Sequence, residues 1–175
     1  MTMGLILIGN AVALIGAALM VAIGFIKDKK RILVAQCAQL TILGVANFLL
    51  GGMSGVVSNA VGIVRNVIGI KREFTTPYKI FFIVLQGVLT ILANNQGWLG
   101  YLPLIACATF TWFLDEEDPV KFKAVIIGGQ ILWGIYDFSI LNFSAGAFDI
   151  FTCISNLIGI WRVKHAIIKQ DEECR

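Results

Sequence analysis

Charged residues are scarce in this chain of 175 residues, since Asp, Glu, Lys and Arg make up 14 % of it. An ordinary soluble domain carries roughly 25 %. The apolar share is 58 %. Uncharged apolar runs of about 20 residues recur, which is the length that a helix needs to cross a bilayer core. The composition therefore predicts an all-α, multi-pass membrane protein and leaves no room for a sizeable soluble domain.

Residues suited to metal, redox or nucleophilic chemistry are also few. The four cysteines are scattered without a CxxC pair, which favours neither a disulfide framework nor a metal site. The single histidine, His165, lies near the C-terminus, so no serine–histidine dyad or metal cluster can form inside the membrane. No nucleotide-binding motif is present. We therefore expect no catalytic residues, no metal, no cofactor and no direct use of ATP.

Hydropathy predicts seven membrane spans. Region 77–114 decides this count, because a single helix of that length would run about 57 Å, far too long for one crossing. The polar turn NNQGWLG at 94–100 divides it. The first segment lacks the basic start of a signal peptide, so we expect it to be retained as a span. The expected spans lie near 4–26, 32–51, 54–71, 78–94, 98–114, 122–141 and 145–162.

Basic residues follow only the odd-numbered spans. Of the fourteen Lys and Arg residues, all but Arg65 come after spans one, three, five or seven, and the other loops contain none. Cytoplasmic loops of membrane proteins carry an excess of Lys and Arg. The pattern therefore predicts an N-terminus outside and a C-terminus in the cytoplasm.

The sequence also contains an internal repeat. The heptad NVIGIKR at 66–72 returns as NLIGIWR at 156–162, and eight positions are identical between 41–72 and 131–162. Polar positions match as well, since Asn47 corresponds to Asp137 and Asn59 to Asp149. Internal repeats of this kind are typical of transporter folds. Chance agreement between two helices rich in Ile and Gly is the alternative.

The repeat predicts the layout of the chain. Each unit holds three spans, and span four turns the chain round again, so the two units lie parallel in the membrane. We expect a first triple-helix bundle at 1–72, a linker with span four at 73–96, a second bundle at 97–165 and a cytoplasmic tail at 166–175.

Three stretches carry a resemblance to known families: GVANFLLGG (44–52), RNVIGIKR (65–72) and SNLIGIWR (155–162). They are similar to YgjV-type bacterial inner-membrane proteins, which implies a bacterial inner-membrane location. The layout of three, one and three helices resembles the SWEET sugar facilitators and the PnuC vitamin transporters. That resemblance implies two bundles around a central path. Its PQ signature is absent here, so no proline hinge is expected in the first bundle.

Asparagines in the third helix of each unit are the first candidates for solute contact. The SWEET resemblance implies that Asn66 and Asn156 face the substrate path. An amide has two donors and an acceptor, which suits a neutral polyhydroxylated or heterocyclic ligand. Asparagines also join packed membrane helices, so both interpretations stay open. Asn47 in span two is a further candidate.

The motif WGIYD at 133–137 supplies Trp133, Tyr136 and Asp137, which could stack on and hydrogen-bond a ring or sugar. Packing within an aromatic belt near the outer surface is the alternative. Arg65 is the one basic residue well inside a span, since the others lie at or beyond the span ends. It could clamp a carboxylate or phosphate, pair with Asp137 or Asp149, or snorkel to the inner surface.

The function predicted from these features is transport of a small polar solute, such as a sugar, nucleoside or vitamin-like compound. We expect facilitated, alternating-access transport by a monomer in a lipid bilayer, with no nucleic-acid partner; proton coupling through Asp137 or Asp149 is a further possibility. A non-transporting scaffold or subunit is the first alternative. An intramembrane aspartyl enzyme is the second, because YD and GAFD resemble its motifs.

Overall fold

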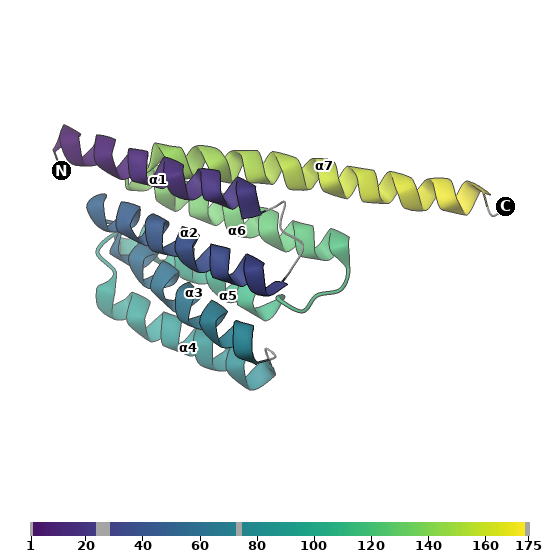
Figure 1. Ribbon diagram of the computed structural model, residues 1–175, viewed down its shortest axis with the longest axis horizontal. Coiled ribbons are helices and arrows are strands. Elements are labelled where there is room, and N and C mark those ends of the chain that lie inside the picture. Colours follow the sequence, from purple (N-terminus) through teal and green to yellow (C-terminus); the bar gives the residue numbers. More distant parts are fainter. Residues whose placement is uncertain (1, 24–28, 73–74, 174–175) are drawn as a thin grey trace.

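The computed structural model describes residues 2–23, 29–72 and 75–173, and the side chains of these except 29, 119, 164 and 166–173. The described chain contains seven α-helices, one 3-10 helix and no strand (Figure 1). The elements are α1 (Met3–Ile23), α2 (Lys29–Leu49), α3 (Met53–Lys71), α4 (Thr76–Ala93), η1 (Gly97–Tyr101), α5 (Leu102–Trp112), α6 (Pro119–Ser139) and α7 (Phe143–Glu173). The all-α prediction is confirmed. The expected end of span one, 24–26, lies outside the described residues.

Five helices are long and apolar enough to cross a membrane, namely α1, α2, α3, α4 and α7. The helix α6 is about 32 Å long, but it carries Lys121, Lys123 and Asp137. The fifth expected span is divided, since η1 precedes an α5 of only 11 residues. Together the two pieces rise about 26 Å. The division falls at Pro103, which lies at the start of α5, where its missing N–H costs no helical hydrogen bond.

The distribution of polarity is the reverse of that in a soluble domain. Large apolar side chains cover the outside, including Leu92 at 78 % exposed and Phe151 at 65 %. The buried residues include many polar ones, such as Asn47, Asn59 and Asn142, each at most 4 % exposed. Apolar side chains that would aggregate in water are stable against lipid, whereas polar side chains must find partners inside the protein.

Six helices pack in a closed cycle. The packed pairs are α1 with α2, α2 with α3, α3 with α5, α5 with α6, α6 with α7 and α7 with α1. The helix α4 lies outside this cycle, against α3 and α5 (Figure 1). Small residues allow the closest approach: a Cβ at Gly9 would lie 2.6 Å from Leu50 Cγ, and one at Gly16 would lie 2.9 Å from Leu43 Cδ2. Such contacts are the usual means by which membrane helices associate.

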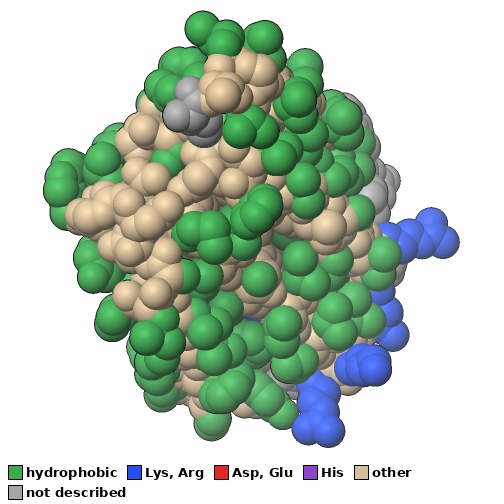
Figure 2. Space-filling view, turned by 90° about the vertical axis from the view of Figure 1, so that its left-hand side faces the viewer, with side chains coloured by type: hydrophobic (Ala, Val, Ile, Leu, Met, Phe, Trp, Pro, Cys, Tyr) green, Lys and Arg blue, Asp and Glu red, His purple; other side chains and the backbone are tan. Residues whose placement is uncertain are grey.

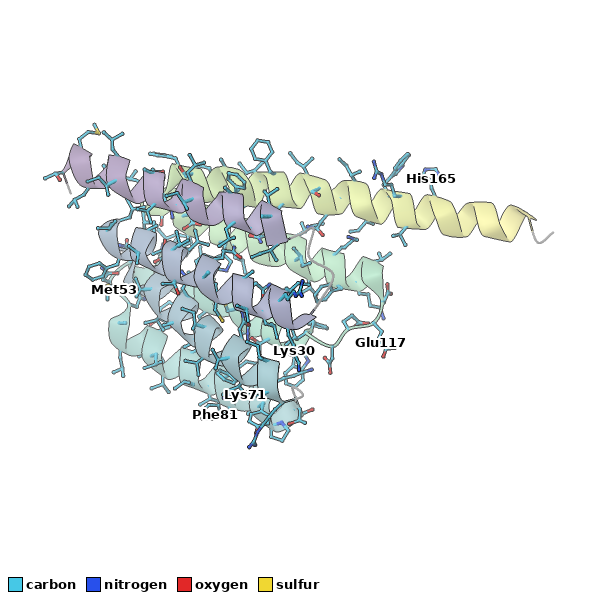
Figure 3. All side chains as sticks on the ribbon, in the orientation of Figure 1. Lys30, Met53, Lys71, Phe81, Glu117 and His165 are labelled. Carbon is cyan, nitrogen blue, oxygen red and sulfur yellow. The ribbon has the colours of Figure 1, made fainter. Side chains whose placement is uncertain are left out.

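The two ends of the helix bundle differ in charge. At one end, which we call the neutral end, lie the connections 50–52, 94–101 and 140–142. At the opposite, basic end lie Lys30, Lys71 and Glu117, as Figure 3 shows relative to Met53. Seen from the neutral end, the surface shows hydrophobic side chains interspersed with other side chains and backbone, and it shows Lys and Arg at its edge (Figure 2). Lys27 and Arg175 lie outside the described residues.

An ion pair joins α4 to the end of α5 at the basic end. Lys79 is 5 % exposed and donates hydrogen bonds to the Trp112 carbonyl oxygen (3.0 Å) and to Asp115 Oδ1. Both partners line an open hollow of about 450 Å³. In the run DEED at 115–118, Asp115 pairs with Lys79, and Asp118 accepts hydrogen bonds from the first N–H groups of α6.

The Asp115→Asn variant tests this ion pair. The hydrogen bond from Lys79 is the main reason that the pKa of Asp115 lies below its ordinary value. A carboxyl with a lowered folded-state pKa stabilises the fold above its unfolded pKa, and that contribution is lost as the pH falls through the folded value. We expect the variant to melt below wild type at pH 7, and we expect the difference to shrink as the pH falls below the ordinary aspartate pKa of about 3.9 and through the lowered folded-state value. Glu117→Gln is the control, and equal melting of Asp115→Asn and wild type at pH 7 would refute the pairing.

Candidate functional site

The two hairpins at the neutral end have the same backbone geometry. In the α2–α3 hairpin the Gly52 N–H donates to the Asn47 carbonyl oxygen at 2.8 Å, and in the α6–α7 hairpin the Asn142 N–H donates to that of Asp137 at 2.8 Å. The paired positions are ninety residues apart. This bond pattern is that of a Schellman motif, which ends a helix and reverses the chain.

A left-handed residue and a bridging asparagine complete each hairpin. Gly51 has φ 74°, and at the same place Leu141 has φ 63°, which is costly for a residue with a Cβ. Asn95 donates to the Gly51 carbonyl oxygen (2.8 Å) and accepts from the first N–H of α3 (3.4 Å). Asn10 donates to the Leu141 carbonyl oxygen (2.8 Å) and accepts from a first-turn N–H of α7 (2.9 Å). Both helix starts are therefore capped from another helix or loop.

Tyr136 on α6 is fully buried and connects the two hairpins. Its hydroxyl oxygen accepts a hydrogen bond of 2.8 Å from the Gly55 N–H, which lies in the first turn of α3 and has no partner within its own helix. A Cβ at Gly52 would lie 2.6 Å from the same hydroxyl oxygen, so that position requires glycine. The Trp133 ring packs edge-to-face on Tyr136, with centroids 5.9 Å apart.

Five polar side chains near the neutral end, which we call the polar layer, are Asn47, Asn59, Asp137, Asn142 and Asp149. The Asn142 amide lies at the centre of this layer. Its Nδ2 faces two acceptors, Asn47 Oδ1 at 3.2 Å and Asp137 Oδ1 at 3.4 Å. Its Oδ1 accepts from the Ala145 N–H at 3.3 Å and thereby caps α7. One side chain therefore links α2, the end of α6 and the start of α7.

Asp137 and Asp149 form a buried carboxyl pair between α6 and α7. Asp137 is 4 % exposed, and Asp149 packs against Gly134, which lies one helical turn before Asp137 on α6. Asp149 Oδ2 is buried without a hydrogen-bond donor, and Gly134 leaves the space that it occupies. Two full negative charges about 4 Å apart repel by about 4 kcal/mol at an effective dielectric constant of about 20. A buried carboxyl pair without a basic partner among the described residues is destabilised when both groups are ionised.

The positions that the predicted repeat pairs carry amides on α2 and α3 and carboxyls on α6 and α7. Asn47 corresponds to Asp137 and Asn59 to Asp149. A Cβ at Gly44 would lie 3.5 Å from Asn59 Cβ, as one at Gly134 would from Asp149 Cβ. Asn59 Nδ2 is, like Asp149 Oδ2, buried without a partner. Asn59 and Asp149 are each the seventh residue of their helices, about 9 Å from the helix start.

Asn66 and Asn156 lie farther toward the basic end and have different local partners. Asn66 is 3 % exposed and donates from Nδ2 to Gln36 Oε1 on α2 at 3.2 Å. Asn156 is half-buried and donates to the Thr152 carbonyl oxygen of its own helix at 2.9 Å. The structure does not bring them into the polar layer around Asn142. Their contact with a solute stays a prediction.

Arg65 forms no ion pair with a carboxylate among the described residues. Its guanidinium donates to Thr111 Oγ1 at 3.1 Å and lies 5.5 Å from the centre of the Phe110 ring. The pairing with Asp137 or Asp149 that we considered is therefore wrong. Both carboxyls lie near the neutral end, whereas Arg65 lies about 18 Å along α3 and faces α5.

A second buried polar cluster joins α4 to the cycle of helices. Gln86 on α4 donates to Ser58 Oγ on α3 at 3.0 Å.

The sequence predicted Asn47, Trp133, Tyr136 and Asp137, and the structure brings all four together. The sequence did not predict Asn142, Asn10 or Asn95 as residues of the site. Asn142 corresponds to Gly52 in the first unit, so the repeat gave no polar match at that position. A signal was present in the hairpin itself, because an asparagine just before a helix start is a preferred cap.

The comparison with protein families gives one match. The model of the Imp-YgjV family, described as a bacterial inner membrane protein, matches residues 7–167. The chain belongs to this family. No curated protein and no solved structure matches it. The predicted location in a bacterial inner membrane, with several crossings, is confirmed by this membership and by the five membrane-length helices.

The Tyr136→Phe variant tests the connection between the hairpins of this Imp-YgjV protein. It leaves the first turn of α3 with an unpaired, buried N–H at Gly55, which costs about 1–3 kcal/mol of unfolding free energy. We expect a lower midpoint of unfolding in detergent. Tyr101→Phe removes the hydroxyl of an exposed tyrosine and is the matched control. Equal midpoints for the two variants would show that the Tyr136 hydroxyl does not hold α3.

Proposed function

We propose that this protein is a transporter of a small polar solute, built from two parallel three-helix units. The units are α1–α3 and α5–α7, with α4 as the linker, and the basic end faces the cytoplasm. The observation that carries the proposal is the polar layer around Asn142. There two matching pairs, Asn47 with Asn59 and Asp137 with Asp149, lie at one depth in different units.

The helix packing supports the two-unit arrangement. The helices pack in equivalent pairs in the two units. The pair α1–α2 corresponds to α5–α6, and α2–α3 corresponds to α6–α7. The two contacts between the units, α3–α5 and α7–α1, also correspond to each other. The hairpins at 50–52 and 140–142 share their hydrogen bonds and their left-handed residue, although the sequences there differ. Substrate sites of repeat-built transporters lie between the repeats, with access alternating as one unit moves against the other.

The unpartnered groups of the layer favour a solute that carries hydroxyl groups. Asn59 Nδ2 is a buried donor without an acceptor, and Asp149 Oδ2 is a buried acceptor without a donor. A hydroxyl group can accept from the first and donate to the second. The edge-to-face rings of Trp133 and Tyr136 lie in the same region and suit a sugar or heterocyclic ring. Sugars, nucleosides and vitamin-like compounds all fit this description.

One observation favours a second function, that of an intramembrane aspartyl enzyme. Asp149 packs one helical turn from Asp137, and two carboxyls that share a proton can activate a water molecule. Both carboxyls lie within about 9 Å of the α6–α7 hairpin, near the outer edge of the membrane rather than in its interior. Transport therefore remains the better supported function. A scaffold role would leave the unpartnered buried groups without a purpose.

Thermal stabilisation of the purified protein by a panel of solutes tests the proposal. The panel contains sugars, nucleosides, vitamins, amino acids, organic anions and a hydroxyl-bearing peptide that mimics the tetrahedral intermediate of proteolysis. A ligand at 100 times its Kd adds about 2.7 kcal/mol of stability. We expect a hydroxyl-bearing solute to stabilise wild type and to lose this effect in Asn59→Ala.

Variant Asn66→Ala separates the two predicted sites. If the solute binds in the layer around Asn142, the Asn66→Ala variant is still stabilised by the solute. If the Asn66→Ala variant is no longer stabilised, the result would favour a site at the paired asparagines Asn66 and Asn156. Stabilisation by the peptide mimic alone would support the enzyme. No stabilising solute, together with no counterflow uptake in proteoliposomes, would contradict the transport function.

A further inference from the structure

The two units differ most in one chemical respect, which is the charge of their matching pairs. In the first unit Asn47 and Asn59 are amides, which carry no charge at any physiological pH. In the second unit Asp137 and Asp149 occupy the matching positions, and Asp149 packs against Gly134, one helical turn before Asp137. Only the second pair can bind and release a proton.

No positively charged side chain among the described residues neutralises the Asp137–Asp149 pair. The nearest titratable side chains along α6 and α7 are the Tyr136 phenol, next to Asp137, and the Cys153 thiol, one turn after Asp149. The segment of α1 packed on α7 has no titratable residue. Cys107 is the one titratable residue of α5, and the described basic residues of α6 and α7 lie at the basic end. No Lys or Arg among the described residues pairs with either carboxyl.

The polar contact between the units depends on the same pair. Asn142 Nδ2 lies between Asn47 Oδ1 (3.2 Å) in the first unit and Asp137 Oδ1 (3.4 Å) in the second. Hydrogen bonds to an ionised acceptor are about twice as strong as those between neutral groups. Loss of the proton therefore draws this amide toward Asp137 and weakens its bond to the first unit. A second negative charge also pushes α6 and α7 apart at the place where the hairpin turns.

We propose that the Asp137–Asp149 carboxyl pair binds the proton that this protein moves together with its solute. The proposal rests on the transport function above and specifies its driving force. When the site opens to water on one side, one carboxylate takes up a proton and becomes a carboxylic acid. When it opens on the other side, the acid returns the proton to water. The bound proton allows the polar layer to close, because it removes one of two adjacent charges.

Infrared spectroscopy of the purified full chain tests the protonation directly. At pH 7 we expect wild type to show the C=O stretch of a protonated carboxylic acid and the double variant Asp137→Asn, Asp149→Asn to lack it. The double variant copies the amides of the first unit and conserves volume, which favours folding. Asp115→Asn is the control, because Asp115 is exposed, and it keeps the band. Absence of this band from wild type would overturn the proposal.

A second measurement does not require any variant to fold. A carbodiimide reacts with protonated carboxyls inside membranes, and peptide mass mapping then locates the adduct. We expect an adduct on Asp137 or Asp149 at pH 7. An unmodified pair under conditions in which the protein is otherwise intact would overturn the proposal.

Proteoliposomes loaded with a pH-sensitive dye test the coupling. With the solute found by the panel, a gradient of about one pH unit drives about tenfold accumulation if one proton moves per solute. We expect this accumulation in wild type and its loss in Asp149→Asn. Solute flux that ignores the gradient would overturn the coupling and leave the transport function intact. Absence of any solute flux from wild type would overturn both, whatever the infrared band shows.

Discussion

The structure depends on one constraint: inside a bilayer every polar group must be satisfied by the protein itself. Helix interiors meet this constraint with their own hydrogen bonds, but helix starts and hairpins do not. The asparagines Asn10, Asn95 and Asn142 and the Tyr136 hydroxyl supply the missing partners at the neutral end. Because Asn10 on α1 caps α7 and Tyr136 on α6 caps α3, the capping contacts tie α1–α3 to α6 and α7.

The fold follows from the sequence where lipid determines it. Runs of apolar residues predicted the helices, and charge asymmetry predicted which loops share an end, because both signals arise from the transfer of side chains from water to lipid. The division of the fifth span was missed, although Pro103 marked it, because hydropathy does not detect a 3-10 turn. The helical continuation of α7 to Glu173 was also missed, since a polar tail carries no lipid signal.

The site was only partly predictable for a different reason. Asn47, Asp137 and Tyr136 were found because intramembrane polar residues are costly and therefore informative. The partners of Arg65 and Asn66 were not found, because they are set by contacts of α3 with α5 and α2 that the local sequence does not encode. Asn142 was missed because the repeat equates it with a glycine. A repeat therefore predicts the positions that the two units share and conceals those in which they differ.

The central claim is that the layer around Asn142 opens alternately to the two sides of the membrane, and cysteine labelling tests it without knowledge of the solute. Asn59→Cys would be placed in a chain lacking the four native cysteines. A membrane-impermeant thiol reagent would then be applied to right-side-out and to inside-out vesicles. Alternating access predicts labelling of position 59 from both sides, at rates that a bound solute lowers. Labelling from neither side, or from one side alone, would contradict the account.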